Sequence, residues 1–347
     1  MVTENGYRPN VTPNALVLSR PDGFSGAVLA SVVLKPAREA LPNTRIFLLI
    51  HKKFAPLYVN HPDLTGILTF SEESTPEEIA AHFKKQKIDA LAHLEYSELV
   101  AKAAALAGVR ETSAFERQCG GNAKYEILDS AAHRASHEAF HNFEVLEPFG
   151  ITVAHRPLLN LSVHADACAE AFRKLEKYGI VKGMEYAVFC LDPNRLEHCV
   201  DASVFAKAAE WLNQNTKMPV VVLGDKGFSD KGFLRFCNES HGANIVDLRG
   251  ETTSAETAHL LKAARLCLTG ENAHAYLASA MNCPVITLFV DFSAGRWFPL
   301  GYLSTNVFTG AQRFPLEPRS FYNFRASRAF GHGKIASALE FSLALKK

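Results

Sequence analysis

A polar turn, Thr269-Gly270-Glu271-Asn272, lies between two segments that the sequence predicts to be ordered. The apolar run 266–268 before it is typical of a short buried strand, and the alanine-rich segment 273–281 after it favours a compact helix. A second apolar run, 285–289, completes a β-α-β unit. Open α/β sheets bind ligands at the carboxyl ends of their strands, so this turn is a candidate ligand site. The free N–H groups and the positive dipole end of the following helix would suit a phosphate.

Three histidines, His133, His137 and His141, recur at every fourth position of a predicted helix over 130–146. This spacing places them on one helical face, where imidazoles could bind a metal. The alternative is a partly exposed face whose imidazoles hydrogen-bond to neighbouring groups. Since no cysteine or close carboxylate pair accompanies the histidines, we expect no metal site here.

The composition is that of an ordinary globular chain. It has 347 residues, 48% hydrophobic and 21% charged, which is long enough for two domains. The formal net charge of +1 gives no reason to expect a nucleic-acid partner. The cysteines form no C-x-x-C pair and several lie in apolar runs, which favours reduced core thiols in a cytoplasmic protein. The polar first ten residues do not match a signal peptide, and no apolar segment approaches the ~20 residues that a membrane-spanning helix needs.

Strands and helices alternate along two stretches of the chain, which predicts an α/β fold of two doubly wound domains. The chain changes character between Gly150 and about Gly183, so we place the domains at 1–160 and 161–333. We expect a ligand cleft between them, and a C-terminal helix, 334–347, that packs back on the first domain. The expected strands are 15–18, 45–50, 66–70 and 88–92 in the first domain, and 186–190, 220–223, 245–247, 266–268 and 285–289 in the second.

Several short segments carry a family resemblance. The segment from Arg20 to Pro42 can be laid without gaps on the family's N-terminal motif, and the segment ending Leu146-Glu147-Pro148-Phe149-Gly150-Ile151 is similar to another. The chain resembles glycosyltransferase family 9, the ADP-heptose:lipopolysaccharide heptosyltransferases. This resemblance implies the GT-B fold, in which two Rossmann-like domains face a cleft, with the acceptor on the N-terminal side and the nucleotide sugar in the C-terminal domain. The remaining matches are Leu223-Gly224, Asp247-Leu248-Arg249-Gly250-Glu251-Thr252-Thr253, the run 260–266, and Arg296-Trp297-Phe298-Pro299-Leu300-Gly301.

The sequence differs from the family at functional positions. The family's Gly-Asp pair, whose aspartate is its proposed general base, corresponds to Ser25-Gly26 on the acceptor-side loop. Its D-[ST]-G-x-x-H donor motif corresponds to the segment from Glu271 to Tyr276, and the lysine of its phosphate loop to His198. The G-P-T after its last strand corresponds to Val290-Asp291-Phe292.

An inverting sugar transfer needs cations or N–H groups that stabilise the departing diphosphate. For the loop cations Arg195 and Lys226, the alternative to this role is a solvated surface charge. Glu271 could accept hydrogen bonds from a sugar or merely cap the helix that follows it, and His274 could be an ordinary packed histidine. By resemblance, the donor-binding residues are Arg195, His198, Lys226, Glu271, Asn272, Ala273 and His274, with no metal and no cofactor.

The transfer also needs a base that takes the proton of the acceptor hydroxyl. Gly26 has no side chain, and Asp22 is the only carboxylate in the loop 19–25 before it. Asp22 is therefore either a relocated catalytic base or a turn residue of the Pro-Asp-Gly kind.

The function implied by the resemblance is metal-independent, inverting transfer of a sugar, heptose by resemblance, to a cell-envelope glycan or lipopolysaccharide. The expected partners are an ADP-heptose-like nucleotide sugar and a glycan or lipid-linked glycan acceptor. The expected location is the cytoplasm, with at most peripheral contact with the inner membrane. Two alternatives stay open: a degenerate GT-B protein that binds a nucleotide, glycan or protein partner without catalysis, and another nucleotide-sugar enzyme of this fold, such as an epimerase.

Overall fold

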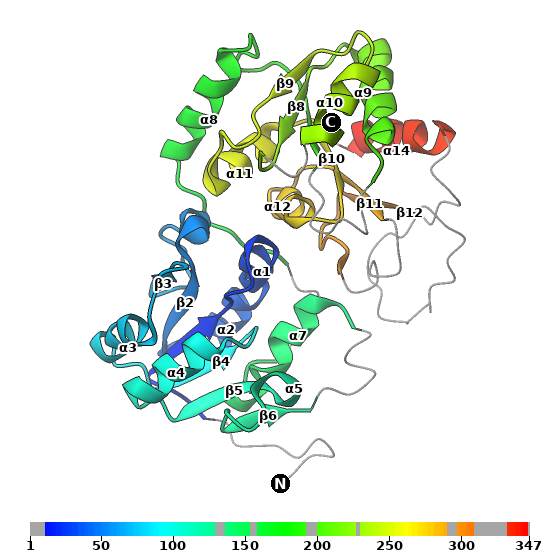
Figure 1. Cartoon of the computed structure of the whole chain (residues 1–347). Coiled ribbons are helices and arrows are strands. Elements are labelled where there is room, and N and C mark those ends of the chain that lie inside the picture. The colour runs from blue at the N-terminus through cyan, green and yellow to red at the C-terminus, as the bar shows by residue number, and fades with distance from the viewer. Residues whose placement is uncertain are drawn as a thin grey trace. The chain divides into compact units, whose positions relative to one another are not determined.

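The computed structural model describes residues 11–128, 136–152, 158–191, 200–226, 230–289, 297–308 and 332–345. The chain divides into two compact units, Met1–Ser162 and Val163–Lys347 (Figure 1). This division lies close to the boundary expected after residue 160. Each unit is built on its own six-stranded sheet.

The first unit contains a parallel sheet with the strand order β3-β2-β1-β4-β5-β6. This is the doubly wound Rossmann order, whose direction reverses between β1 and β4. There Ser19 and His93 face each other across the last residues of the two strands. The strands are β1 (Ala15–Ser19), β2 (Arg45–His51), β3 (Gly66–Phe70), β4 (Ala90–His93), β5 (Glu111–Phe115) and β6 (Tyr125–Ile127).

The helices of this unit begin and end where local chemistry favours it. At the start of α3, Thr75 and Glu78 form a capping box, with Pro76 as the first helical residue. At the end of α4, Gly108 takes a left-handed conformation with φ of 75°. The helical segments are α1 (Phe24–Leu29), η1 (Ala30–Val33), α2 (Leu34–Ala40), η2 (Lys52–Leu57), α3 (Pro76–Lys85), α4 (Glu98–Ala107), α5 (Glu116–Cys119), α7 (Glu138–Glu144) and η3 (Glu147–Phe149).

The second unit repeats the same topology. Its parallel sheet has the order β12-β11-β10-β7-β8-β9, so the switch point lies between β7 and β10. Two Rossmann-like doubly wound units confirm the predicted fold class. The strands are β7 (Ala187–Cys190), β8 (Val220–Leu223), β9 (Ile245–Asp247), β10 (Leu266–Gly270), β11 (Val285–Phe289) and β12 (Ser304–Phe308). The helices are α8 (Asp166–Glu176), α9 (Ala202–Thr216), α10 (Asp230–Glu239), α11 (Ser254–Ala263), α12 (Ala273–Ala280) and α14 (His332–Leu345).

The C-terminal helix α14 belongs to the second unit, so the prediction that it packs on the first domain is wrong. It lies against α9, β11 and β12 (Figure 1). Ile335, Ala338 and Leu339 are buried in the core cluster that also holds Phe205, and Val307 of β12. The helix covers apolar side chains near the β12 edge that would otherwise face water.

Three short strands were not predicted: β5, β6 and β12. Each runs along or next to the edge of its sheet and has polar residues, as in Glu111-Thr112-Ser113 and Ser304-Thr305-Asn306. Edge strands bury less apolar surface than central ones, so their sequences lack the apolar runs that reveal the central strands.

Two other expectations concern burial and membranes. The described cysteines carry free thiols, and Cys119, Cys190, Cys267 and Cys283 are buried. Among the described helices, none combines the length and the apolar character needed to cross a bilayer.

Candidate functional site

The switch point of the second unit is formed by the carboxyl ends of β7 and β10. β10 ends at Gly270, and α12 begins at Ala273, so Glu271 and Asn272 form the whole connection. The first N–H groups of α12 therefore lie at the sheet edge where doubly wound folds bind ligands. Arg195 and His198 follow β7 in the chain but lie outside the described residues.

Asn272 determines how α12 begins. Its side-chain oxygen Oδ1 accepts a hydrogen bond from the backbone N–H of His274 at 2.9 Å and one from Thr269 Oγ1 at 3.0 Å. This is N-capping by a preferred residue type. Glu271 is half-buried and Ala273 is buried. Glu271 was expected either to bind a sugar or to cap α12. Because Asn272 caps this helix, Glu271 stays a candidate for ligand binding.

His274 is a buried, neutral histidine. Burial lowers its pKa to about 4, although the charge of Asp225 acts in the opposite direction. Its Nδ1 lies 3.3 Å from Asn272 Oδ1, an oxygen that can only accept, so Nδ1 carries the proton. A neutral imidazole supplies no positive charge to a phosphate, and His274 supports the cap instead.

Lys226 lies on the loop after β8, and this loop is attached to the loop after β9. The N–H of Gly250 donates to the carbonyl of Gly224 at 2.7 Å. Lys226 Nζ lies 3.4 Å from Glu251 Oε1, and both side chains are exposed. An exposed pair of this kind contributes about 0–1 kcal/mol, so the ammonium can exchange this partner for a phosphate at little cost.

Tyr276, which occupies the position of the family's motif histidine, has a structural contact. It is buried in α12, and its hydroxyl donates to the backbone carbonyl of Trp297. The contact connects α12 with the segment after β11. Tyr276 therefore helps to position 297–300, where Phe298 and Leu300 are buried.

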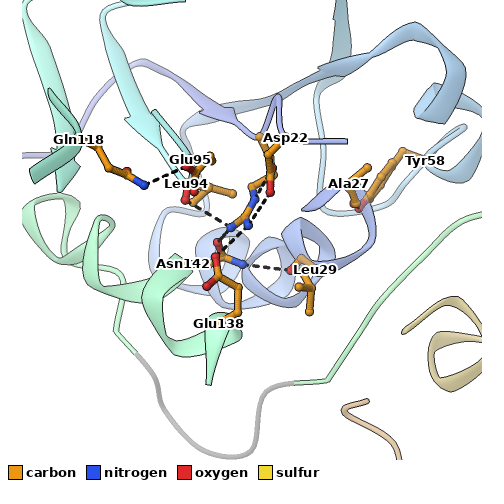
Figure 2. A network of polar contacts seen from close by, with 10 residues as sticks. Asp22, Ala27, Leu29, Tyr58, Leu94, Glu95, Gln118, Glu138 and Asn142 are labelled. Atoms are coloured by element: carbon orange, nitrogen blue, oxygen red, sulfur yellow. Dashed lines mark hydrogen bonds and ion pairs between the residues drawn. The ribbon is translucent and has the colours of Figure 1, made fainter. Parts of the chain in front are cut away.

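The switch point of the first unit contains a buried guanidinium. Arg20 follows β1 and is only 1% exposed. Its Nε and Nη2 donate to the two oxygens of Asp22 at 2.6 and 2.9 Å, and Nη2 also donates to Glu138 at 2.8 Å. Nη1 donates to Asn142 at 2.5 Å and to the carbonyl of Leu94 at 3.3 Å (Figure 2). Burial alone would lower the pKa of Arg20, but the charges of Asp22 and Glu138 raise it, so the guanidinium stays protonated.

Asp22 fills the space beside Gly26. A Cβ placed on Gly26 would lie 2.0 Å from Asp22 Oδ1 and 2.5 Å from its Cγ. Position 26 is where the family resemblance puts the catalytic aspartate. The carboxylate of Asp22 thus occupies the start of that missing side chain, while both its oxygens hold Arg20. Ser25 lies half-buried next to it on α1.

Three polar residues of this cluster were not predicted from the sequence: Glu95, Glu138 and Asn142. Glu138 and Asn142 are one turn apart on α7, a polar i, i+4 pair that could have suggested a buried polar contact. Glu95 is the second residue after β4, whose neighbour is β1, and a polar residue at this place is a recognisable signal. Its carboxylate accepts from Gln118 Nε2 at 2.9 Å.

The histidines 137 and 141 do not share a helical face, contrary to the prediction. His137 precedes α7 and caps it, since its Nδ1 accepts from the N–H of Ala139 at 3.1 Å. His141 lies within α7, with its ring 5.5 Å from that of Phe115. The helix begins after His137 because the histidine side chain itself satisfies a free N–H of the first turn. His133 lies outside the described residues.

Comparison with known proteins agrees with this architecture. Lipopolysaccharide heptosyltransferase 3 of Escherichia coli K12 is 21% identical over 282 residues, which cover 78% of this chain and 81% of the relative. A family 9 glycosyltransferase from Veillonella parvula superposes with a TM-score of 0.80 at 15% identity, over 96% of this chain and 98% of that one. E. coli ADP-heptose lipopolysaccharide heptosyltransferase II superposes with a TM-score of 0.76 at 14% identity, over 95% and 99%. These structures share the fold, which is the GT-B arrangement of two Rossmann-like domains.

The family assignment rests on the sequence itself. Residues 100–316 match the model of glycosyltransferase family 9 (heptosyltransferase), which is more than half of the chain. The matched range includes α7, the β8 and β9 loops and α12, the elements that carry most of the candidate residues. The chain therefore belongs to glycosyltransferase family 9.

Proposed function

We propose that this protein transfers a sugar from a nucleotide diphosphate donor to a glycan acceptor of the cell envelope, with inversion and without a metal. The observation that carries the proposal is the start of α12 at the β7/β10 switch point, where Asn272 caps the helix and Glu271 lies beside it. Helix N–H groups and the exposed ammonium of Lys226 offer positive charge to a diphosphate. Arg195 and His198 are proposed to add to this charge.

The donor class follows from the relatives. The E. coli relative is named a lipopolysaccharide heptosyltransferase, and the heptosyltransferase II structure is named for ADP-heptose. We therefore propose an ADP-heptose-like donor and a lipopolysaccharide-like or lipid-linked glycan acceptor. This acceptor would place the enzyme in the cytoplasm with peripheral contact with the inner membrane.

A ligand-binding protein without catalysis is the second candidate function. It is favoured by a specific observation: the family's base position is Gly26, and the neighbouring Asp22 is engaged with Arg20 through both oxygens. Each carboxylate oxygen of Asp22 already accepts a hydrogen bond from the buried guanidinium, so this side chain has a structural contact in place of a free carboxylate edge.

Two measurements separate these functions. Thermal shift with ADP, UDP, GDP and ADP-heptose should show stabilisation by the ligand that fits the folded protein. Binding should survive EDTA and weaken with salt, because the positive charge comes from protein groups. A transfer assay that follows release of the nucleotide diphosphate then distinguishes the two. Binding of a nucleotide without release of the diphosphate, with any acceptor glycan, supports the non-catalytic protein, whereas absence of nucleotide binding contradicts the proposed transferase.

A further inference from the structure

We propose that Glu95 is the catalytic base that takes the proton of the acceptor hydroxyl, and that Asp22 is a positioning residue that holds Arg20. This proposal rests on the proposed transferase function. It is carried by the arrangement of three carboxylates around one guanidinium at the switch point of the first unit.

Glu95 lies at the sheet edge where a ligand of the first unit is expected. It is the second residue after β4. Its own N–H and that of Leu94 donate to the carbonyl of Ser19, the last residue of β1, at 3.4 and 3.0 Å. The backbone of Glu95 is thereby fixed beside the β1/β4 crossover. Its side chain is half-buried and accepts from Gln118 Nε2, as Figure 2 shows.

The charges of this cluster do not balance. Arg20 is surrounded by Asp22, Glu138 and Glu95, so one positive charge faces three carboxyl groups. A guanidinium has five N–H donors. Those of Arg20 make two hydrogen bonds to Asp22 and one each to Glu138, Asn142 and the carbonyl of Leu94, and none of these bonds goes to Glu95. Glu95 feels the negative charges of the cluster without a direct bond to its cation.

The protonation of Glu95 reflects this position. Burial raises its pKa above the ordinary glutamate value, and the charges of Asp22 and Glu138 raise it further. Arg20 and the hydrogen bond from Gln118 act in the opposite direction. A carboxylate with a raised pKa is a stronger base than an ordinary one.

The other carboxylates are less suited to the task. Asp22 has both oxygens on Arg20, and Glu138 is 2% exposed and also bonded to Arg20, so a bulky acceptor cannot reach it. Glu72 follows β3, the edge strand of the sheet, and hydrogen bonds from His51 and Lys53 lower its pKa to about 2. A group with so low a pKa accepts a proton poorly.

The proposed step is balanced. The acceptor oxygen forms a bond to the anomeric carbon while its proton passes to a Glu95 carboxylate oxygen. The bond between the anomeric carbon and the diphosphate oxygen breaks, and its electron pair leaves with the diphosphate. Glu95 then returns the proton to solvent.

The test compares Glu95→Gln with the native protein, using Glu98→Gln as the matched control. Glu98 lies three residues further on, its side chain is 76% exposed, and it pairs with Lys102 on the surface of α4. We expect Glu95→Gln to lower kcat by about 10²–10⁴-fold, which is the usual contribution of a general base. Nucleotide affinity and Tm should stay at native values, and Glu98→Gln should keep native turnover.

The pH profile provides the second measurement. Native kcat/KM should fall on the acid side with an apparent pKa above the ordinary glutamate value, and this limb should be absent in Glu95→Gln. Glu95→Asp keeps a carboxylate, so it should retain part of the activity, with the acid limb of its pH profile shifted. This variant also tests the assignment of the base if Glu95→Gln fails to fold. A native protein that binds nucleotide sugars but transfers none refutes the proposed function. If the native protein is active, either of two results refutes only the assignment of the base: Glu95→Gln is as active as the native protein, or the acid limb of the pH profile is unchanged in Glu95→Asp.

Discussion

Replacing Gly26 with alanine should destabilise the first unit, although glycine-to-alanine changes inside helices ordinarily stabilise by roughly 0.5–1 kcal/mol. Gly26 lies in α1, and an added Cβ would meet Asp22 Oδ1 at 2.0 Å. The carboxylate must therefore move, and it holds Arg20 through two hydrogen bonds.

The magnitude follows from these two effects. A hydrogen bond to a charged group contributes about 1.5–3 kcal/mol. Asp22 retains 30% exposure, and Arg20 keeps Glu138 and Asn142, so we count the loss of about one such bond. After the helix-propensity gain is subtracted, we expect Gly26→Ala to lower the free energy of unfolding by about 1–2 kcal/mol. In a unit of this size that corresponds to a Tm decrease of about 2–8 °C.

Urea denaturation of three variants tests this explanation. Gly232→Ala is the control, because Gly232 lies in α10 with open space around its Cβ, and it should be neutral or stabilising. In an Asp22→Ala background, Gly26→Ala should lose most of its cost, since no carboxylate is left to displace. The reasoning is refuted if Gly26→Ala is as stable as the native protein, or if its effect is the same with and without Asp22.

Three further predictions concern single side chains. Burial lowers the pKa of His93 to about 4, so the unfolded chain takes up the proton first as the pH falls. The contribution of neutral His93 to the free energy of unfolding is therefore fully present above pH ~6.5, and it decreases towards pH ~4 by up to roughly 3 kcal/mol. In denaturation experiments at a series of pH values, His93→Gln should flatten this pH dependence. A variant whose stability depends on pH as steeply as that of the native protein would contradict the prediction. Asn272→Ala removes the cap of α12 and should lower the free energy of unfolding, measured by urea titration, by about 1 kcal/mol. Asn272→Asp keeps a capping oxygen and should be close to the native protein in stability. Equal stability of the native protein and both variants would show that the cap contributes nothing. Arg249→Lys removes two hydrogen bonds to Asp247, at 2.9 and 3.1 Å, and the stacking of the guanidinium 3.6 Å from the centre of the Phe233 ring. The free energy of unfolding should therefore fall by about 1–2 kcal/mol, although the positive charge is retained. A native Tm in thermal unfolding would refute this account.

The fold class could be predicted from the amino-acid sequence. Central strands such as β1, β10 and β11 are continuous apolar runs, and helices such as α3 and α12 begin at capping residues that neighbours in the chain supply. These signals are local, because hydrophobic periodicity and capping involve residues a few positions apart. The family's motifs were recognisable for the same reason, since each is a short continuous segment.

Which side chains contact one another became clear from the folded structure. Arg20 and Asn142 are 122 positions apart, yet they are in hydrogen-bond contact because β1 and α7 come together in the folded unit. The engagement of Asp22 and the charges around Glu95 depend on this assembly, since a charge acts through distance and burial rather than through sequence order. The docking of α14 was likewise not determined by sequence, because an apolar helix fits any sheet face that leaves apolar side chains uncovered. In the folded chain this helix covers such side chains of the second unit, near the β12 edge.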